Sequence, residues 1–162
     1  MPEHKIIAFA NQKGGVGKTT SAVNIASSLA AKKYSVLLVD CDPQGNATSG
    51  LGIRKKSSSG SVYDVIIGRS KTADMVCSTT VKNLSVLPSS MDLVGAEIEL
   101  IDMADREARL RAALEQVRDS YDFIIIDCPP SLGLLTLNCL TAADGVVIPL
   151  LCEFYSLEGI SQ

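Results

Sequence analysis

Residues 11–20 are Asn-Gln-Lys-Gly-Gly-Val-Gly-Lys-Thr-Thr, and this stretch decides the fold of the chain. It follows a short apolar run at 6–10 and precedes residues 21–31, where apolar side chains recur at helical spacing. A strand, a glycine-rich loop and a helix, in this order, form the setting of a phosphate-binding loop. Glycines allow successive backbone N–H groups to turn toward an anion, and the helix N-terminus adds partial positive charge. The stretch therefore predicts a nucleotide site.

The loop differs from the standard phosphate-binding pattern at its first position. That pattern, G-x-x-x-x-G-K-[ST], requires a glycine five residues before Gly17, where this chain has Gln12. A second lysine, Lys13, opens the loop instead. We predict that Lys18 neutralises the β- and γ-phosphates and that the Thr19 hydroxyl ligates Mg²⁺. The loop residues predicted to bind the nucleotide are Gly14, Gly15, Val16, Gly17, Lys18, Thr19 and Thr20.

Two apolar runs downstream each end in an aspartate. Residues 36–40 are Val-Leu-Leu-Val-Asp, and residues 123–127 are Phe-Ile-Ile-Ile-Asp. Continuous rather than alternating hydrophobicity indicates strands buried on both faces, as in a parallel sheet covered by helices. Open α/β sheets bind ligands at the carboxyl ends of their strands, so Asp40 and the following Asp42 are expected beside the glycine loop.

Each aspartate has a predicted role in phosphoryl transfer, which requires the phosphates and metal to be held and a water molecule to be aligned. Asp127 follows the Walker B arrangement and is expected to hold Mg²⁺ opposite Thr19. Asp42 lies on a loop that can follow the γ-phosphate and is the candidate to orient the attacking water. Asp40 is either an outer-sphere partner of the metal or a structural strand end, and the sequence leaves both alternatives open.

The other apolar patterns predict alternating helices and strands. The predicted segments are helices at 61–68, 91–103, 105–118 and 132–142, and strands at 84–87 and 146–150, the last of them buried. Ser90 is expected to cap the helix at 91–103, with Leu93, Leu100 and Ile101 facing inward. A surface loop is expected at 49–60, and a loop and helix from 153. The predicted fold class is α/β, a doubly wound, mostly parallel sheet flanked by helices.

The composition indicates one soluble globular domain of 162 residues, with 46% hydrophobic and 20% charged residues. The net charge of −3 and the pI near 5.1 argue against a protein built mainly to hold nucleic acid. The five cysteines are widely spaced without a C-x-x-C pair, which favours buried thiols in a reducing cytosol over an iron–sulfur ligand set. Apolar stretches fall short of the roughly 20 residues that span a bilayer, so we expect no membrane association and a cytoplasmic location.

The loop motif K-G-G-x-G-K-T-T is the deviant Walker A motif, and the sequence resembles the ParA/Soj/MinD family of P-loop ATPases. The resemblance covers essentially the whole chain. Residues 40–52 look like the family's switch I segment, 121–133 look like its Walker B and switch II segments, and 153–159 match its next landmark. The run D-P-Q-G-N-A-T-S-G at 42–50 favours ParA/Soj over MinD and over nitrogenase iron protein.

The resemblance implies an ATP- and Mg²⁺-dependent partitioning ATPase. By this resemblance Lys13 is the signature lysine that reaches the partner's phosphates across a nucleotide-sandwich dimer, and Lys13, Lys18 and Asp42 act in catalysis. Family members segregate chromosomes or plasmids, dimerise with ATP and bind DNA non-specifically, which places them on the nucleoid. A ParB-type partner with a basic N-terminal segment stimulates them. Slow hydrolysis then acts as a timer that releases the dimer.

Members of that family are longer than this chain. Residues 1–162 are therefore expected to form a single P-loop ATPase domain that lacks the C-terminal part of the family's fold, including much of the adenine pocket and the basic residues that hold DNA. Three alternatives stay open: a MinD-like ATPase that positions cell division, a metallocluster protein, and a nucleotide-binding fragment without turnover. The MinD-like alternative predicts a C-terminal amphipathic helix, which is not found before Gln162.

Overall fold

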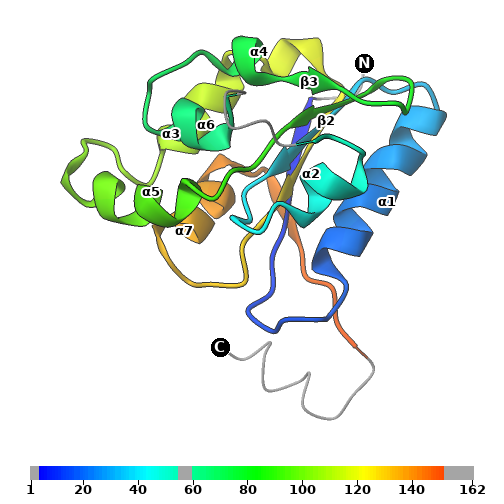
Figure 1. Ribbon diagram of the computed structural model, residues 1–162. Coiled ribbons are helices and arrows are strands. Elements are labelled where there is room, and N and C mark those ends of the chain that lie inside the picture. Colours follow the sequence, from blue (N-terminus) through cyan, green and yellow to red (C-terminus); the bar gives the residue numbers. More distant parts are fainter. Residues whose placement is uncertain (1–3, 55–59, 152–162) are drawn as a thin grey trace.

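The computed structural model describes residues 4–54 and 60–151, which build a six-stranded sheet with the order β3-β4-β2-β5-β1-β6 (Figure 1). The strands are β1 (Lys5–Phe9), β2 (Val36–Asp40), β3 (Cys77–Ser78), β4 (Leu84–Leu87), β5 (Phe123–Asp127) and β6 (Gly145–Val147). All neighbouring strands are parallel except β3, which pairs antiparallel with β4. The predicted mostly parallel sheet is confirmed.

Helices cover both faces of this sheet. They are α1 (Lys18–Ala31), α2 (Asn46–Gly50), α3 (Val62–Ile66), α4 (Thr72–Met75), α5 (Leu93–Glu99), α6 (Arg109–Glu115) and α7 (Leu134–Ala142), with 3-10 turns η1 (Leu100–Asp102) and η2 (Arg118–Ser120). Figure 1 shows α1 on one side of the sheet and α3, α5, α6 and α7 on the other. This is the doubly wound arrangement that the sequence predicts.

The buried strands divide their side chains between two cores. Val36 and Leu38 pack with α1 on one face, whereas Leu37 and Val39 pack with α3, α5, α6 and α7 on the other. Every residue of β2 is buried. A continuous apolar run is stable here because each face of the strand meets a layer of helices, and burying one such side chain contributes about 1.5–3 kcal/mol.

Helix α1 lies close to the sheet because its inner stripe is alanine. Ala22, Ala26 and Ala30 are almost completely buried against β1, β2 and β5, while Ile25 is exposed. Among the described residues, no helix is both long and apolar enough to cross a membrane.

The parallel register brings the two strand-ending aspartates together. Asp40 of β2 pairs with Asp127 of β5, and Asp127 pairs in turn with Phe9, the last residue of β1. The glycine loop leaves β1 at this point. Three neighbouring strands therefore deliver the loop and both carboxylates to one edge of the sheet, as expected for a ligand site in an open α/β fold.

The prediction of a buried strand at 146–150 is wrong. The strand is β6, it is exposed along its length, and it pairs with β1 on one side only among the described strands. A continuous apolar run marks a buried strand only when neighbours cover it, and the sequence pattern does not carry that information.

The helix predicted at 91–103 is shorter and faces differently from the prediction. It begins at Leu93, the Ser90 hydroxyl donates to the Asp92 carboxylate rather than capping the helix, and Ile101 is 52% exposed instead of buried. The helix gives way at Leu100 to the 3-10 turn η1, whose tighter winding rotates the following side chain away from the core. Leu93 and Leu100 are buried as predicted.

The prediction of buried thiols is confirmed for Cys41, Cys128 and Cys139, which are fully buried and free, whereas Cys77 is free but only partly buried. Cys152 and the loop and helix predicted from 153 lie outside the described residues, as does most of the basic part of the loop at 49–60.

Candidate phosphate and metal site

The glycine loop takes a backbone path that only glycine adopts easily. Gly15 and Gly17 have φ angles of 76° and 82°, in the left-handed region where a Cβ is unfavourable. Between them, the Val16 side chain is buried and anchors the loop to the core. At the start of the loop, the Lys13 N–H donates to the Asn11 side-chain oxygen at 2.8 Å. The loop is therefore held at both ends while its glycines expose backbone N–H groups.

The first turn of α1 is built to receive an anion. Gly17 is the N-cap, no side chain caps the helix, and the first turn contains no acidic residue. The first N–H groups of this 14-residue helix consequently have no intrahelical partner, and the helix dipole favours negative charge beside them. Lys18, which is only 8% exposed, adds a full positive charge at the same place. This combination fits a phosphate group.

A cavity of about 230 Å³ lies over this helix end. It is lined by Gly14, Gly15, Gly17, Lys18, Thr19, Thr20, Asp42, Asn46 and Pro130. These residues come from the loop after β1 and the first turn of α1, from the segment between β2 and the first turn of α2, and from the loop after β5. The structure thus places Asp42 beside the glycine loop, where the sequence predicts it.

Asp127 is a fully buried carboxylate without a protein partner. It is 0% exposed, and neither of its oxygens accepts a hydrogen bond from the described residues. Burial raises the pKa of Asp127 to about 7, although the nearby Thr19 hydroxyl and Lys18 ammonium group partly oppose this rise and the charges of Asp40 and Asp42 add to it. A buried carboxylate is costly unless a proton or a cation compensates it. Its environment therefore fits a cation held between Asp127 and Thr19.

A cation at this place would need ligands from outside the protein. Within the described part of the chain, no group of three or more His, Cys, Asp or Glu side chains is arranged to hold a metal ion. Mg²⁺ commonly binds through one or two protein oxygens together with water and substrate phosphates. One carboxylate and one hydroxyl beside a phosphate site are a donor set of this kind.

Asp40 is satisfied by the protein itself. Its Oδ2 accepts hydrogen bonds from the Thr48 N–H and hydroxyl at 2.7 and 2.6 Å, and its Oδ1 accepts one from the Asp42 N–H at 3.2 Å. Burial raises the pKa of Asp40, and the hydrogen bonds from Thr48 and Asp42 limit the rise. These contacts favour the structural strand end over the outer-sphere metal partner.

Asp42 is almost buried and projects from a tightly held turn. Its Oδ1 accepts a hydrogen bond from the Gln44 N–H at 2.9 Å, and its backbone carbonyl accepts one from the Gly45 N–H at 2.8 Å. Asp42 also lines the cavity, together with the glycine loop and Lys18. Lys13, in contrast, is exposed and does not line the cavity of this single chain.

Comparisons with known proteins agree with this geometry. A family model described as an AAA domain matches residues 4–162. Over 158 residues the chain is 60% identical to the sporulation initiation inhibitor protein Soj of Bacillus subtilis (strain 168), covering 98% of this chain and 62% of that protein. It is 54% identical to the chromosome partitioning protein ParA of Myxococcus xanthus, covering 98% of this chain and 56% of that protein. This chain belongs to the ParA/Soj family of P-loop ATPases.

Solved structures share the fold of this chain. A cobyrinic acid a,c-diamide synthase from Mycobacterium smegmatis, solved with bound ADP and magnesium, matches with a TM-score of 0.92 and 43% identity over 98% of this chain and 64% of that one. An ATP complex of a McdA variant from Cyanothece matches with a TM-score of 0.91 and 28% identity over 99% of this chain and 61% of that one. This ParA/Soj-family chain thus spans about three fifths of the length of the relatives it matches.

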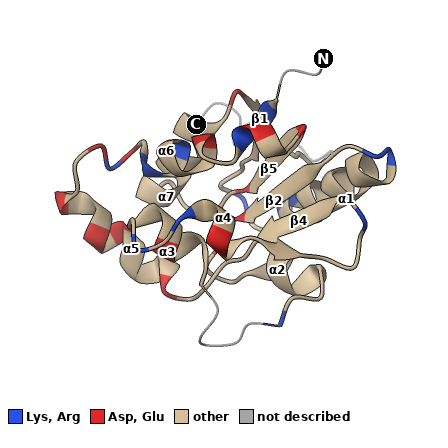
Figure 2. Ribbon diagram, turned by 90° about the horizontal axis from the view of Figure 1, so that it is seen from above, with Lys and Arg blue, Asp and Glu red and all other residues tan. Residues whose placement is uncertain are grey.

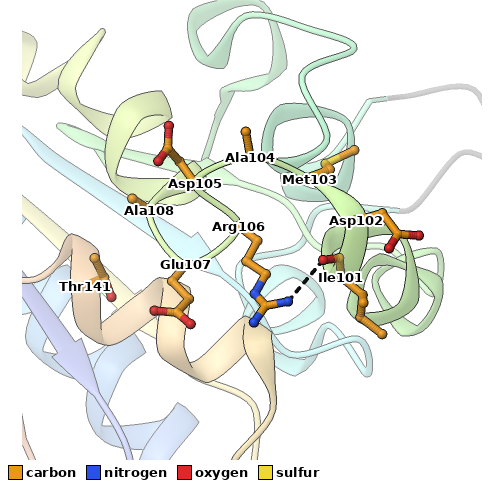
Figure 3. Close-up of a pocket in the computed structure, with 9 residues that line it drawn as sticks. All are labelled: Ile101, Asp102, Met103, Ala104, Asp105, Arg106, Glu107, Ala108 and Thr141. Carbon is orange, nitrogen blue, oxygen red and sulfur yellow. Dashed lines mark hydrogen bonds between the residues drawn. The ribbon is translucent and has the colours of Figure 1, made fainter.

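A larger cavity, of about 690 Å³, lies beside the connection from η1 to α6 (Figure 3). This connection is far from the glycine loop in the sequence. Residues 101–108 and Thr141 line it, and the Arg106 guanidinium group donates to the Ile101 carbonyl across it at 3.1 Å. None of the side chains that line it is both polar and buried. It is an open surface depression, so we assign the chemistry to the smaller cavity.

Sequence reasoning missed several residues around the site of this family member. Asn46 and Pro130 line the cavity, and Thr48 and Ser89 hold the turn that carries Asp42. Asn46, Thr48 and Pro130 lie within segments that already resemble the family's switch regions, so that signal was present. No local pattern indicates Ser89, which meets the turn from the segment that follows β4.

Proposed function

We propose that this chain binds Mg·ATP and hydrolyses it slowly, as the nucleotide-binding part of a ParA/Soj-type partitioning ATPase. The observation that carries the proposal is Asp127, a fully buried carboxylate whose two oxygens have no hydrogen-bond partner among the described residues and which lies beside the N-terminus of α1. The family relationship and the nucleotide and magnesium named for a solved relative support the same choice of ligand.

The residues divide into groups that hold and groups that act. The N–H groups of Gly14 to Thr20 bind the phosphates, and Lys18 neutralises the charge on the β- and γ-phosphates. Asp127 and Thr19 hold Mg²⁺, which offsets the negative charge that develops on the phosphates. Asp42 orients the attacking water from the rim of the cavity.

The finer properties of the family are part of the same proposal. ATP drives dimerisation, and Lys13, which is exposed on the single chain, reaches the phosphates of the second copy. A ParB-type activator and non-specific DNA are the proposed partners of the complete protein, in chromosome or plasmid segregation on the nucleoid. In the described region, Lys and Arg residues are spread over several elements (Figure 2), so DNA binding is proposed for the protein as a whole. The named relatives are Soj and ParA proteins, which disfavours the MinD-like alternative.

The test measures sedimentation with ADP or ATP plus Mg²⁺ and follows phosphate release in the same samples. The wild type is expected to form an ATP-specific dimer and to release phosphate slowly. We expect Lys18→Ala to abolish nucleotide binding and Asp42→Ala to bind ATP without hydrolysing it. Lys32→Ala, at the opposite end of α1, and Asp119→Ala, in η2, serve as exposed controls. A wild-type chain without nucleotide affinity or turnover would refute the proposal. A chain that binds nucleotide but does not hydrolyse it would instead support the alternative of a nucleotide-binding fragment without turnover.

A further inference from the structure

Four buried residues form a closed ring of hydrogen bonds directly behind the cavity. Thr48 donates from its N–H and hydroxyl to Asp40, the Ser89 N–H donates to the Thr48 hydroxyl at 3.0 Å, the Ser89 hydroxyl donates to the Asp42 carbonyl, and the Asp42 N–H donates back to Asp40. We call these residues, Asp40, Asp42, Thr48 and Ser89, the Asp40 ring. All are at most 6% exposed.

The ring fixes the backbone of Asp42 from both sides. The N–H of Asp42 is held by the Asp40 carboxylate, and its carbonyl is held by the Ser89 hydroxyl. Asp40 is the last residue of β2, Thr48 lies in α2, and Ser89 follows β4. The position of the Asp42 backbone is therefore set by β2, α2 and the segment after β4, and not by its own turn alone.

The chemistry of the ring also explains why these side chains are hydroxyls. The Thr48 hydroxyl donates to Asp40 and at the same time accepts from the Ser89 N–H, so it needs both functions of an O–H group. A methyl group in its place would leave an Asp40 lone pair and the Ser89 N–H without partners inside the protein. A buried polar network in which every group is hydrogen-bonded is rigid and specifies one conformation, whereas a network with unpaired groups does not.

We propose that Thr48 and Ser89 are positioning residues for hydrolysis: through the Asp40 ring they hold the Asp42 carboxylate in line with the attacking water. This inference rests on the proposed ATPase function and on the role of Asp42 in it. Neither Thr48 nor Ser89 lines the cavity, so both act through the backbone of Asp42. Nucleotide binding is proposed to depend on the glycine loop and Lys18, and the hydrogen bonds of the ring join only its own four residues.

The test compares variants by single-turnover hydrolysis and by the Kd for Mg·ADP. Thr48→Val and Ser89→Ala are expected to slow hydrolysis roughly 10- to 100-fold, the size of effect that about 1 Å of misplacement produces, while the Kd changes less than about threefold. Thr48→Ser keeps the hydroxyl and is expected to restore most of the rate. Thr72→Val is the matched control, because its buried hydroxyl also donates one hydrogen bond, to the Ala113 carbonyl at 2.7 Å, on the helices that cover the other face of the sheet.

Three outcomes would overturn the inference: an unchanged rate in Thr48→Val, an equal loss of rate in Thr72→Val, or a loss of rate that follows a loss of Mg·ADP affinity. Deuterium exchange of residues 41–50 in the same variants separates this inference from the proposed function. Thr48→Val and Ser89→Ala are expected to speed exchange there, and Thr72→Val is not. If the wild type does not hydrolyse ATP, the proposed function fails. If deuterium exchange of residues 41–50 is also unchanged in Thr48→Val, the claim that the Asp40 ring holds this segment is refuted as well.

Discussion

Replacing Asp127 by asparagine should stabilise the nucleotide-free protein, although Asp127 is proposed to be essential for metal binding. The substitution keeps the shape of the side chain and removes its charge. Burial raises the pKa of Asp127 from 3.8 to about 7. Because the folded-state pKa lies above the unfolded value, the folded protein holds the proton more tightly. The contribution of Asp127 to stability is therefore full below about pH 4, falls as the pH rises, and reaches its minimum above about pH 7.

The size of the effect follows from the same shift. About three pKa units correspond to about 4 kcal/mol of destabilisation by the charged form at high pH. The introduced asparagine would bring its own unpaired amide, which costs about 1–3 kcal/mol but does not depend on pH. The change in relative stability with pH therefore reports the charge of Asp127 without a contribution from the asparagine amide. The stability of Asp127→Asn relative to the wild type should increase by about 2–3 kcal/mol between pH 5 and pH 8.

The assay is urea unfolding in EDTA at pH 5, 6.5 and 8. Asp144→Asn is a control without pH dependence in this range: burial opposes ionisation of Asp144, but the Ile6 N–H and Arg118 outweigh it and lower its pKa. Its carboxylate contributes its full stability above the unfolded pKa, so Asp144→Asn should cost the same stability at all three pH values. In samples without EDTA, added Mg²⁺ should increase the stabilisation by ADP in the wild type but not in Asp127→Asn. If the difference in unfolding free energy between Asp127→Asn and the wild type does not change with pH, Asp127 is not an uncompensated buried carboxylate, and the reasoning is refuted.

Three further predictions concern the loop and the core. Lys13→Ala is expected to keep nucleotide binding and to lose the ATP-dependent dimer in sedimentation; an unchanged dimer would contradict the proposed role of this lysine. Gly17→Ala should destabilise the nucleotide-free protein by about 1–2 kcal/mol in urea unfolding, because its φ is 82° and nothing crowds the added Cβ. Gly14→Ala, where φ is not positive and space is also open, is the matched control, and equal losses in both would refute the conformational reason. Leu110→Ala, at a fully buried position of α6, should cost about 2–5 kcal/mol, and a cost below about 1 kcal/mol would contradict its packing.

The sequence by itself determined the fold class and the position of the site. A strand, the glycine loop and a helix at residues 6–31 specify a phosphate site through local chemistry, since the positive φ angles, the helix N-terminus and Lys18 all belong to one continuous stretch. Apolar strands that end in Asp40 and Asp127 specify a parallel sheet whose carboxyl edge gathers both side chains. These features are periodic or contiguous in the chain, so the sequence is enough to predict them.

Only the tertiary structure separated two aspartates that look alike in sequence. Asp40 and Asp127 both end a buried apolar strand, yet Asp40 is satisfied by Thr48 and Asp127 is left without a partner among the described residues. The partners of Asp40 come from the turn and the helix that follow it, and Ser89, from beyond β4, bonds to Thr48 and to the Asp42 carbonyl. The exposure of β6 and of Ile101 was decided in the same way, by what does or does not pack against them. Burial and hydrogen-bond satisfaction depend on the neighbours that a chain brings together in space, and a local pattern does not specify those neighbours.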